Sequence, residues 1–384
     1  MKQEVYLDAN ASHPLLDRVK AELTRSFEAE TLGNASSVHH AAGRRSRKLL
    51  SNLKDELQRA TGLDSAGWIF TSGATESLNM ALTTALCEGW RVWCTDVEHS
   101  AVLKFCAKRI PEATRLPVLA SGEIDLAHLG QKIMELEKGV DVLLVLQSHN
   151  NETGFPLLRA VDIGAFARLV KSRPEIRILW DAVQSVGKTD PKILRDMLAI
   201  GNYCVVTGHK LGALSGLGAI WRDKASPLKP LLLGGTQEQG MRAGTEALWS
   251  AVAWLEALRE WQENGVFHRE NWTRLKDALV STLAELPRVK LLRGSEKGEC
   301  LANTLPLVVQ GMTSDLMLQK LDLEGVCVSS GSACQSGVAA VSHVLMALGC
   351  SEEESKSFIR VSMPVRCQTK DLDFFVAALR KILA

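Results

Sequence analysis

The chain has 384 residues, of which 46% are hydrophobic, and its 45 Lys and Arg against 44 Asp and Glu give a formal net charge of +1. This length exceeds one ordinary compact core and suits a large domain with a smaller one. The balanced charge argues against direct binding of nucleic acid, and no apolar run approaches the roughly 20 residues that span a bilayer. Because the first residues also lack the pattern of a secretory signal, we expect a soluble, cytoplasmic protein without a membrane partner.

Short apolar runs alternate with longer segments of helical period up to about residue 260, which is typical of an α/β domain with a mostly parallel sheet. The predicted strands are GWIFTS, RVWCT, VDVLLVLQS, IRILWDA, YCVVTG and LGAIW. The predicted helices lie near 74–88, 99–109 and 160–171.

Beyond residue 260 the pattern changes to a small α+β arrangement. It begins with a charged amphipathic helix (NWTRLKDALVSTLAEL) and continues with the predicted strands VKLLRG, LANTLPLVV, GVCVSS and FIRVSMP. Helices are predicted near 314–323, after Cys334 and at the end of the chain. We predict a large domain over 16–260 and a small domain made of 1–15 and 261–384.

The nine cysteines form no C-x-x-C pair and no Cys/His cluster of metal-site spacing, which argues against a disulfide framework and a structural metal. Five of them lie among apolar residues and are expected to be reduced thiols in or near the core. They are Cys87, Cys94, Cys106, Cys204 and Cys327. Cys334 differs, because SSGSACQSG surrounds it with glycine and serine.

Ligands of open α/β sheets bind beyond the carboxyl ends of the strands, so the residues just after each predicted strand are informative. IFTS is followed by GATESLNMAL, which begins a helix with small residues and a threonine. Free backbone N–H groups at such a helix start favour an anion. Ser72, Gly73 and Thr75 are equally compatible with an ordinary turn and N-cap.

Two charged residues follow neighbouring predicted strands. Asp181 ends IRILWDA, and Lys210 follows YCVVTG. Pyridoxal phosphate requires a lysine for its aldehyde, a carboxylate for its ring nitrogen and an anion site for its phosphate. The pattern therefore indicates this cofactor, with a structural Asp181–Lys210 ion pair as the alternative.

Ten short stretches are distributed over nearly the whole chain. They are LDANAS, GNASSVHHAAGR, FTSGATES, EHSAV, NNETG, DAVQSVGK, TGHKLG, GMRAGTE, SSGSAC and IRVSM. In this order they resemble the cysteine desulfurases of the NifS/IscS type, which are class-V aminotransferase-like enzymes of the fold-type-I pyridoxal-phosphate group. The resemblance implies a large domain with a mostly parallel sheet flanked by helices, and a small α+β domain that carries the catalytic cysteine loop.

By this resemblance, Lys210 is the Schiff-base lysine and Asp181 is the partner of the pyridine nitrogen. Gln184 would bind the phenolic oxygen of the cofactor, and His99 would stack on the ring and move protons. From the residues alone, His99 is equally compatible with a helix cap or a core histidine.

The resemblance also implies a phosphate site and a substrate site. The phosphate would be held by Ala74, Thr75, Thr207, His209 and, from a second subunit of a homodimer, Thr245. Asn151, beside the cofactor, and Arg360 would bind the substrate α-carboxylate. Arg360 alternates with apolar neighbours, so the solvent face of an edge strand is its alternative placement.

The resemblance identifies Cys334 as the nucleophile that takes sulfur from L-cysteine, which gives L-alanine and a persulfide. A flexible loop rich in glycine and serine suits a sulfur carrier, and the alternative is an incidental exposed thiol. CQSGVAAVSH has the loop length of the NifS/IscS type, which favours direct transfer to an acceptor or scaffold protein in iron–sulfur cluster assembly or another thio-cofactor pathway. A selenocysteine lyase, an aminotransferase or another fold-type-I enzyme, and a catalytically idle assembly partner remain as alternatives.

Overall fold

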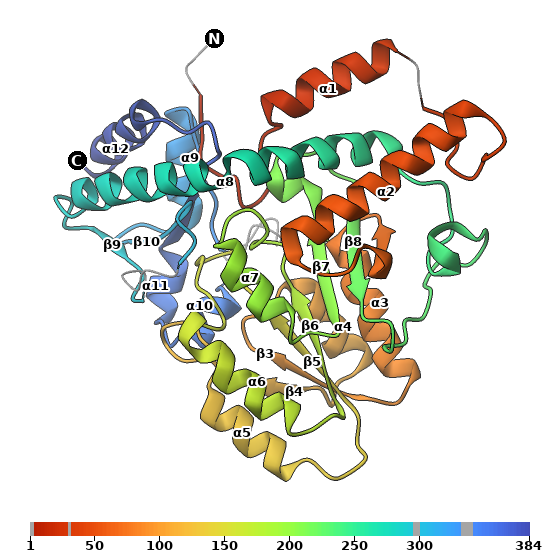
Figure 1. The fold of residues 1–384 in the computed structure, drawn as a ribbon. Helices are drawn as coiled ribbons and strands as arrows, with labels where there is room; N and C mark the ends of the chain where they lie inside the picture. Colours follow the sequence, from red (N-terminus) through yellow and green to blue (C-terminus); the bar gives the residue numbers. More distant parts are fainter. Residues whose placement is uncertain (1–3, 30–31, 295–299, 332–340) are drawn as a thin grey trace.

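The computed structural model describes residues 4–29, 32–294, 300–331 and 341–384 (Figure 1). A seven-stranded sheet forms its larger part, with the strand order β2-β8-β7-β6-β5-β3-β4. Its strands are β2 (Trp68–Thr71), β3 (Arg91–Thr95), β4 (Thr114–Leu116), β5 (Val142–Gln147), β6 (Ile176–Asp181), β7 (Tyr203–Thr207) and β8 (Gly218–Arg222). β8 is antiparallel to both of its neighbours, β2 and β7, and the other pairs of these strands are parallel, so the expected mostly parallel sheet is confirmed.

Successive residues of each central strand enter two different cores, because strand side chains alternate between the two faces of a sheet. In β5, Leu143 and Val145 pack on one face, whereas Val142, Leu144 and Leu146 pack on the other. Both faces are therefore apolar, which explains why the strands are continuous apolar runs in the sequence.

Helices cover both faces of this sheet. The first core contains apolar residues of α3 (Ala74–Cys87) and α4 (Ser100–Arg109). The second contains residues of α1 (Asp17–Glu28), α2 (Ala41–Thr61), α5 (Leu126–Glu135), α6 (Ile163–Lys171), α7 (Pro191–Leu198) and α8 (Leu248–Leu283). No described helix is both long enough and apolar enough to cross a membrane.

The last third of the chain builds a smaller sheet of β9 (Val289–Leu291), β10 (Thr304–Val309) and β12 (Phe358–Ser362), with the order β12-β10-β9. The N-terminal β1 (Val5–Tyr6) pairs in parallel with β11 (Val326–Cys327). Asp8 and Ser362 form a further parallel bridge, so the start of the chain lies against β12. The helices of this part are α9 (Ser314–Leu323), α10 (His343–Ala347), α11 (Glu352–Lys356) and α12 (Thr369–Leu383).

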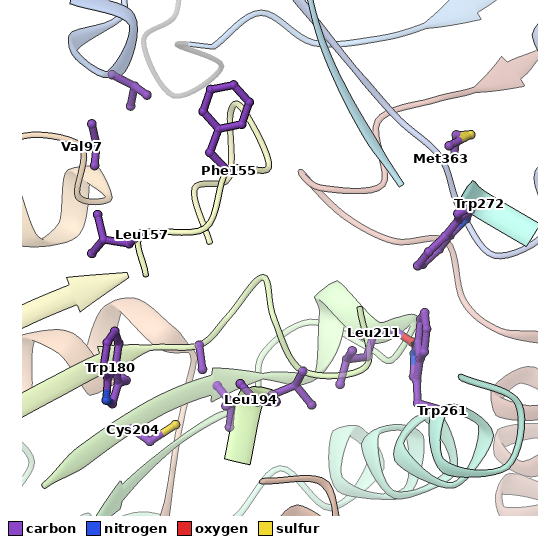
Figure 2. Packing of buried hydrophobic residues seen from close by; sticks show 14 of the residues in the cluster. Val97, Phe155, Leu157, Trp180, Leu194, Cys204, Leu211, Trp261, Trp272 and Met363 are labelled. Carbon is purple, nitrogen blue, oxygen red and sulfur yellow. Dashed lines mark hydrogen bonds between the residues drawn. The ribbon is translucent and has the colours of Figure 1, made fainter. Parts of the chain in front are cut away.

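Helix α8 joins the two parts. It runs from above the large sheet to the neighbourhood of β9, β10 and α12 (Figure 1). Two of its tryptophans, Trp261 and Trp272, form hydrogen bonds to different parts of the molecule. Figure 2 shows both side chains among the buried residues around them. The indole N–H of Trp261 donates to the Leu211 carbonyl at 3.0 Å, and that of Trp272 donates to the Pro364 carbonyl at 3.1 Å.

The structure differs from the sequence-based expectations in three places. Helix α8 begins at Leu248, well before the helix predicted after residue 260, so the domain boundary proposed there falls inside a continuous helix. The short strands β1 and β4 and the helices α1, α2, α5, α7 and α11 were not predicted; a strand of two or three residues is too short for a periodic signal. Cys87, expected in or near the core, is exposed because it is the last residue of α3.

Candidate active site

A cavity of about 520 Å³ opens where the strands of the large sheet end and the smaller sheet begins. Its volume is in the usual range for small-molecule and cofactor sites. Ten of the twelve residues predicted for the site line it. They are Ala74, Thr75, His99, Asn151, Asp181, Gln184, Thr207, His209, Lys210 and Arg360.

One wall of the cavity consists of groups at the strand ends and helix starts of the large sheet. Asp181 is the last residue of β6, Thr207 is the last residue of β7, and His209 and Lys210 lie in the 3₁₀ turn η3 (Gly208–Leu211). The first turn of α3 follows β2 and brings Thr75 to the same wall. This is the arrangement expected for ligands at the carboxyl ends of parallel strands.

The start of α3 provides free backbone N–H groups at the cavity, as every helix start does. Gly73 is the N-cap residue, and no side chain caps the helix there. The turn is packed tightly, since a Cβ on Gly218 of β8 would lie 2.6 Å from the Gly73 Cα. A phosphate would fit the donor character of this end and the helix dipole.

Asp181 is buried at the end of its strand. Its Oδ1 accepts a hydrogen bond from the Val183 N–H at 3.1 Å. Burial raises the pKa of the Asp181 carboxyl, while His99, the Val183 N–H and Lys210 partly oppose that rise. A protonated ring nitrogen placed in the cavity would supply the charge that this carboxylate needs.

Lys210 reaches the same cavity from the neighbouring turn. Its Nζ donates to the carbonyl oxygens of Asn10 at 2.8 Å and Ala11 at 2.6 Å. These acceptors belong to the N-terminal segment, which closes the cavity from the opposite side. The ammonium group is thus held at the cavity edge rather than buried in the sheet.

His99 is the N-cap of α4 and also lines the cavity. Its Nδ1 accepts the Ala101 N–H at 3.1 Å, so it caps α4, and its ring also lines the cavity. Burial lowers the pKa of His99, Asp181 raises it, and Lys210 lowers it further. With Nδ1 used as an acceptor, the proton of the neutral ring lies on Nε2.

Thr207 and His209 form a polar pair in the cavity wall that also contains the first turn of α3. The Thr207 hydroxyl lies 3.0 Å from the His209 Nδ1 and 3.0 Å from the Leu217 carbonyl. Burial, together with Lys210 and Lys188, lowers the pKa of His209 to about 4. The imidazole is therefore neutral at pH 7 and acts as a hydrogen-bonding group.

The wall opposite the sheet centres on Arg360, which is 2% exposed. The expected alternative of a solvent-facing position on an edge strand is therefore wrong, although β12 does lie at the edge of its sheet. The guanidinium donates through Nη2 to Asp8 Oδ1 at 2.5 Å and through Nη1 to the Asn151 carbonyl at 2.9 Å. Its buried Nε has no hydrogen-bond partner among the described residues.

Asn10 connects these two walls. Its backbone carbonyl accepts hydrogen bonds from Lys210 and from Gln184 Nε2, the latter at 3.1 Å. Its side-chain Nδ2 donates to Thr304 Oγ1 at 2.9 Å and to the Asn151 carbonyl at 3.4 Å. With 1% exposure, Asn10 is a fully bonded, buried hub of the site.

Glu152 lies behind the cavity where the described chain resumes after residue 340. Its Oε2 accepts the Ser342 hydroxyl at 2.6 Å, and a side chain on Gly331 would collide with the same oxygen. Burial raises the pKa of Glu152 to about 7, against the lowering effects of Ser342 and Arg360.

Two predicted site residues are not part of the described cavity lining. Cys334 lies outside the described residues, although Gly331 and Val341 on either side of its segment line the cavity. Thr245 is exposed and does not line the cavity of its own chain.

The segment that carries Thr245 is nevertheless anchored to the large sheet. Arg242 donates to Glu76 of α3 at 3.0 Å, and Glu238 pairs with Lys54 at 2.8 Å. The Glu238 carboxylate also accepts the Phe70 N–H of β2 at 3.0 Å. These contacts hold the turn in place around Glu238, whose backbone has a left-handed φ of 45°.

Several polar residues of the site were missed by the sequence-based analysis. Asp8, Asn10, Glu152 and Lys188 are contained in the quoted stretches LDANAS, NNETG and DAVQSVGK, yet no role was predicted for them. What distinguishes these residues is that they are buried, and the burial of a polar residue in a loop cannot be inferred from the sequence. Lys188 and Glu152 are both among the buried charged side chains.

The residues present fit pyridoxal phosphate by their chemistry. The cavity combines a lysine amine, a buried carboxylate that needs a positive partner, and a helix start with hydroxyl and imidazole groups around it. These are the groups that an aldehyde, a ring nitrogen and a phosphate require.

Comparisons with known proteins give a consistent result. A family model described as aminotransferase class-V matches residues 5–375. A protein of Dictyoglomus turgidum named cysteine desulfurase IscS is 32% identical over 393 residues, which cover 100% of this chain and 95% of the relative. A Bacillus subtilis protein named putative cysteine desulfurase IscS 1 is also 32% identical, over 94% of this chain and 93% of its own length.

Solved structures agree with the sequence comparisons. A NifS-like protein from Rickettsia africae has 25% sequence identity and a TM-score of 0.86, with 99% of each chain covered. A second structure described as a NifS-like protein has 27% identity and the same TM-score and coverage. The resemblance seen in the motifs and the expected fold are both confirmed.

Proposed function

This chain belongs to the class-V aminotransferase family, and we propose that it is a pyridoxal-phosphate-dependent cysteine desulfurase that converts L-cysteine into L-alanine and passes the sulfur to an acceptor. One observation carries the proposal. Lys210 and Asp181 meet in a cavity whose lining extends to Gly331 and Val341, the residues that flank the segment of Cys334. This supports a single site for the cofactor and the sulfur-accepting cysteine.

Bound pyridoxal phosphate would act as a sink for the electrons released from the substrate carbon atoms. Lys210 would hold its aldehyde carbon, Asp181 its ring nitrogen and Gln184 its phenolic oxygen. The phosphate would be held by the first turn of α3, with Ala74 and Thr75, and by Thr207 and His209, whose positions around the cavity support this assignment.

The substrate would bind on the wall opposite the sheet. Arg360 and Asn151 would hold its α-carboxylate, since a guanidinium suits a planar anion. To bind this anion, Arg360 would have to share or exchange its contact with Asp8. His99 lines the cavity and uses its Nδ1 to accept the Ala101 N–H, so it would move protons at Nε2.

The sulfur transfer balances without an external oxidant. The Cys334 thiolate forms an S–S bond with the substrate sulfur while the substrate C–S bond breaks. The electron pair of that bond stays on carbon, which takes up a proton and leaves as the methyl group of L-alanine. Cys334 then holds the persulfide, and when an acceptor thiol attacks the outer sulfur, the acceptor becomes the persulfide and Cys334 returns to a thiol.

The partners of this reaction follow from the same proposal. Thr245 is exposed on an anchored segment, which supports its contribution to the phosphate site of a second subunit in a homodimer. An acceptor or scaffold protein of iron–sulfur cluster assembly is consistent with the names of the relatives. The cytoplasmic location stays a prediction.

The test is alanine formation from L-cysteine by purified protein loaded with pyridoxal phosphate, in the presence of a thiol reductant. Wild-type protein should form alanine, and Cys334→Ser should bind the cofactor yet form no persulfide and little alanine. Cys87→Ser is the matched control, because Cys87 is an exposed thiol outside the cavity. Equal alanine formation by Cys334→Ser, or a persulfide found on another cysteine, would contradict the proposal.

A further inference from the structure

Lys188 is a buried lysine that the proposed function does not use. It lies in the turn between β6 and α7 and is 2% exposed. Its Nζ donates to Gln184 Oε1 at 2.7 Å and to Asn10 Oδ1 at 3.1 Å. Both acceptors are neutral amide oxygens, so this amine is buried without an anionic partner in these two contacts.

The charges nearest to Lys188 make its burial more costly. Burial itself lowers the pKa of Lys188 well below the usual value for lysine, and the cations Lys210 and Arg360 lower it further. Even the neutral amine has two N–H groups, which match the two oxygen acceptors. Lys188 therefore donates to Gln184 in either protonation state.

The Gln184 amide is fixed at both of its ends. Its Nε2 donates to the backbone carbonyl of Asn10 at 3.1 Å, an atom that can only accept. Its Oε1 accepts from Lys188. The opposite orientation of the amide would place two acceptors against each other at Asn10 and lose the donated bond from Lys188.

This orientation decides what Gln184 offers to a ligand. Gln184 lines the cavity, its Oε1 is already used, and one hydrogen of Nε2 is already donated. The second hydrogen of Nε2 remains, so the side chain presents a donor. A donor stabilises a phenolate oxygen on the ligand, whereas a carbonyl in its place would favour the protonated phenol.

We propose that Lys188 is a positioning residue that fixes the Gln184 amide with its N–H toward the cavity, so that the phenolic oxygen of bound pyridoxal phosphate is held in its ionised form. This inference rests on the proposed function, because it assumes that the cofactor binds through Lys210 and that its phenolic oxygen faces Gln184.

The experiment is a pH titration of the visible absorption of the cofactor bound to purified protein, without substrate. Lys188→Met keeps the apolar stem and removes the donor. The midpoint, which is the pH at which the change in visible absorption of the bound cofactor is half complete, should rise by about one unit. This is a tenfold change in the protonation equilibrium. Gln184→Leu should shift the midpoint in the same direction. Lys188→Leu is a second replacement without a donor, so the test can be made if either of the two variants folds.

A second comparison separates a positioning role from a general effect on the fold. In a Gln184→Leu background, Lys188→Met should shift the midpoint no further, because Lys188 acts through Gln184. Lys276→Met is the matched control. Lys276 is partly buried and donates to a carbonyl, Leu301 O at 3.4 Å, but it lies outside the cavity, and its replacement should leave the midpoint unchanged.

The outcomes distinguish this inference from the proposed function. Wild-type protein that gives no visible absorption from lysine-bound cofactor would overturn both. Wild-type absorption with an unshifted midpoint in the folded Lys188 variants would overturn only the positioning role. A full additional shift in the Gln184→Leu background would also overturn it, since Lys188 would then act on the cofactor by another route.

Discussion

The two walls of the cavity are built in different ways. The sheet wall takes Asp181, Thr207 and Lys210 from the ends of adjacent strands, whose positions follow from the pairing of one parallel sheet. The opposite wall joins Asp8 to Arg360, which are 352 positions apart in the chain. The first wall depends on local order at strand ends, whereas the second depends on contacts that only the complete fold can form.

The walls also differ in their charge balance. Asp181 on the sheet wall is a buried carboxylate whose pKa is raised by burial. Arg360 on the opposite wall already has a carboxylate partner in Asp8. A positive group of a ligand would thus stabilise the carboxylate of the sheet wall, while the opposite wall would give up or share a contact if an anion bound there.

The largest expected effect tests the sheet wall. Asp181→Asn keeps the shape and the acceptor for the Val183 N–H but removes the charge, so alanine formation from L-cysteine should fall roughly 10²–10³-fold, as for loss of one preorganised electrostatic group. Cofactor bound through Lys210 should still give visible absorption. A rate near that of wild type would show that this carboxylate does not serve the cofactor ring.

The next effect concerns the pH dependence of stability on the opposite wall. Because the pKa of Glu152 is raised to about 7 in the folded protein from 4.5, its proton is held more tightly when folded. The resulting stability is complete below about pH 4.5 and is lost as the pH rises through 7. Measured by urea unfolding at pH 5 and pH 8, wild type should lose up to roughly 3 kcal/mol relative to Glu152→Gln, which does not titrate.

A suitable control for that measurement is Glu112→Gln, since Glu112 is an exposed carboxylate remote from the cavity lining. Its difference from wild type should be the same at both pH values. If the difference in unfolding free energy between Glu152→Gln and wild type is also the same at both pH values, then Glu152 is not a buried group with a raised pKa.

The smallest expected effect tests substrate binding on the opposite wall. Arg360→Lys leaves one nitrogen where the guanidinium contacts Asp8 and the Asn151 carbonyl together, so it should raise the KM for L-cysteine about tenfold with little change in kcat. Arg366→Lys, an exposed arginine outside the cavity, is the matched control. An unchanged KM would remove Arg360 from the substrate site.

The contrast between the walls also explains what the sequence could predict. Asp181 and Lys210 were found from their positions after apolar runs, since strand ends of a parallel sheet converge. Lys188 follows a glycine in a turn, where a lysine is usually exposed. Its burial involves residues far away in the chain, among them Asn10, which is 178 positions distant and accepts a hydrogen bond from it.

The extent of α8 shows the same limit for the fold. Its second half has an amphipathic pattern and was predicted, whereas its first half, with Ala253, Trp254 and Leu255, is buried on several sides and shows no clear stripe. Periodicity therefore located the part of the helix that borders solvent and missed the part that enters the core.

Helix α8 connects the two walls of the cavity through two of its tryptophans. Trp261 holds the carbonyl that follows Lys210, and Trp272, eleven positions later, holds the chain just after β12. At 1.5 Å per residue the backbone positions of these tryptophans are about 16 Å apart along the helix axis and, after three turns, lie on the same face, while their rings lean together to a centroid distance of 5.5 Å. One inserted residue between them would rotate the second anchor by about 100°. The relative position of the two walls therefore depends on the number of residues between two tryptophans that do not line the cavity.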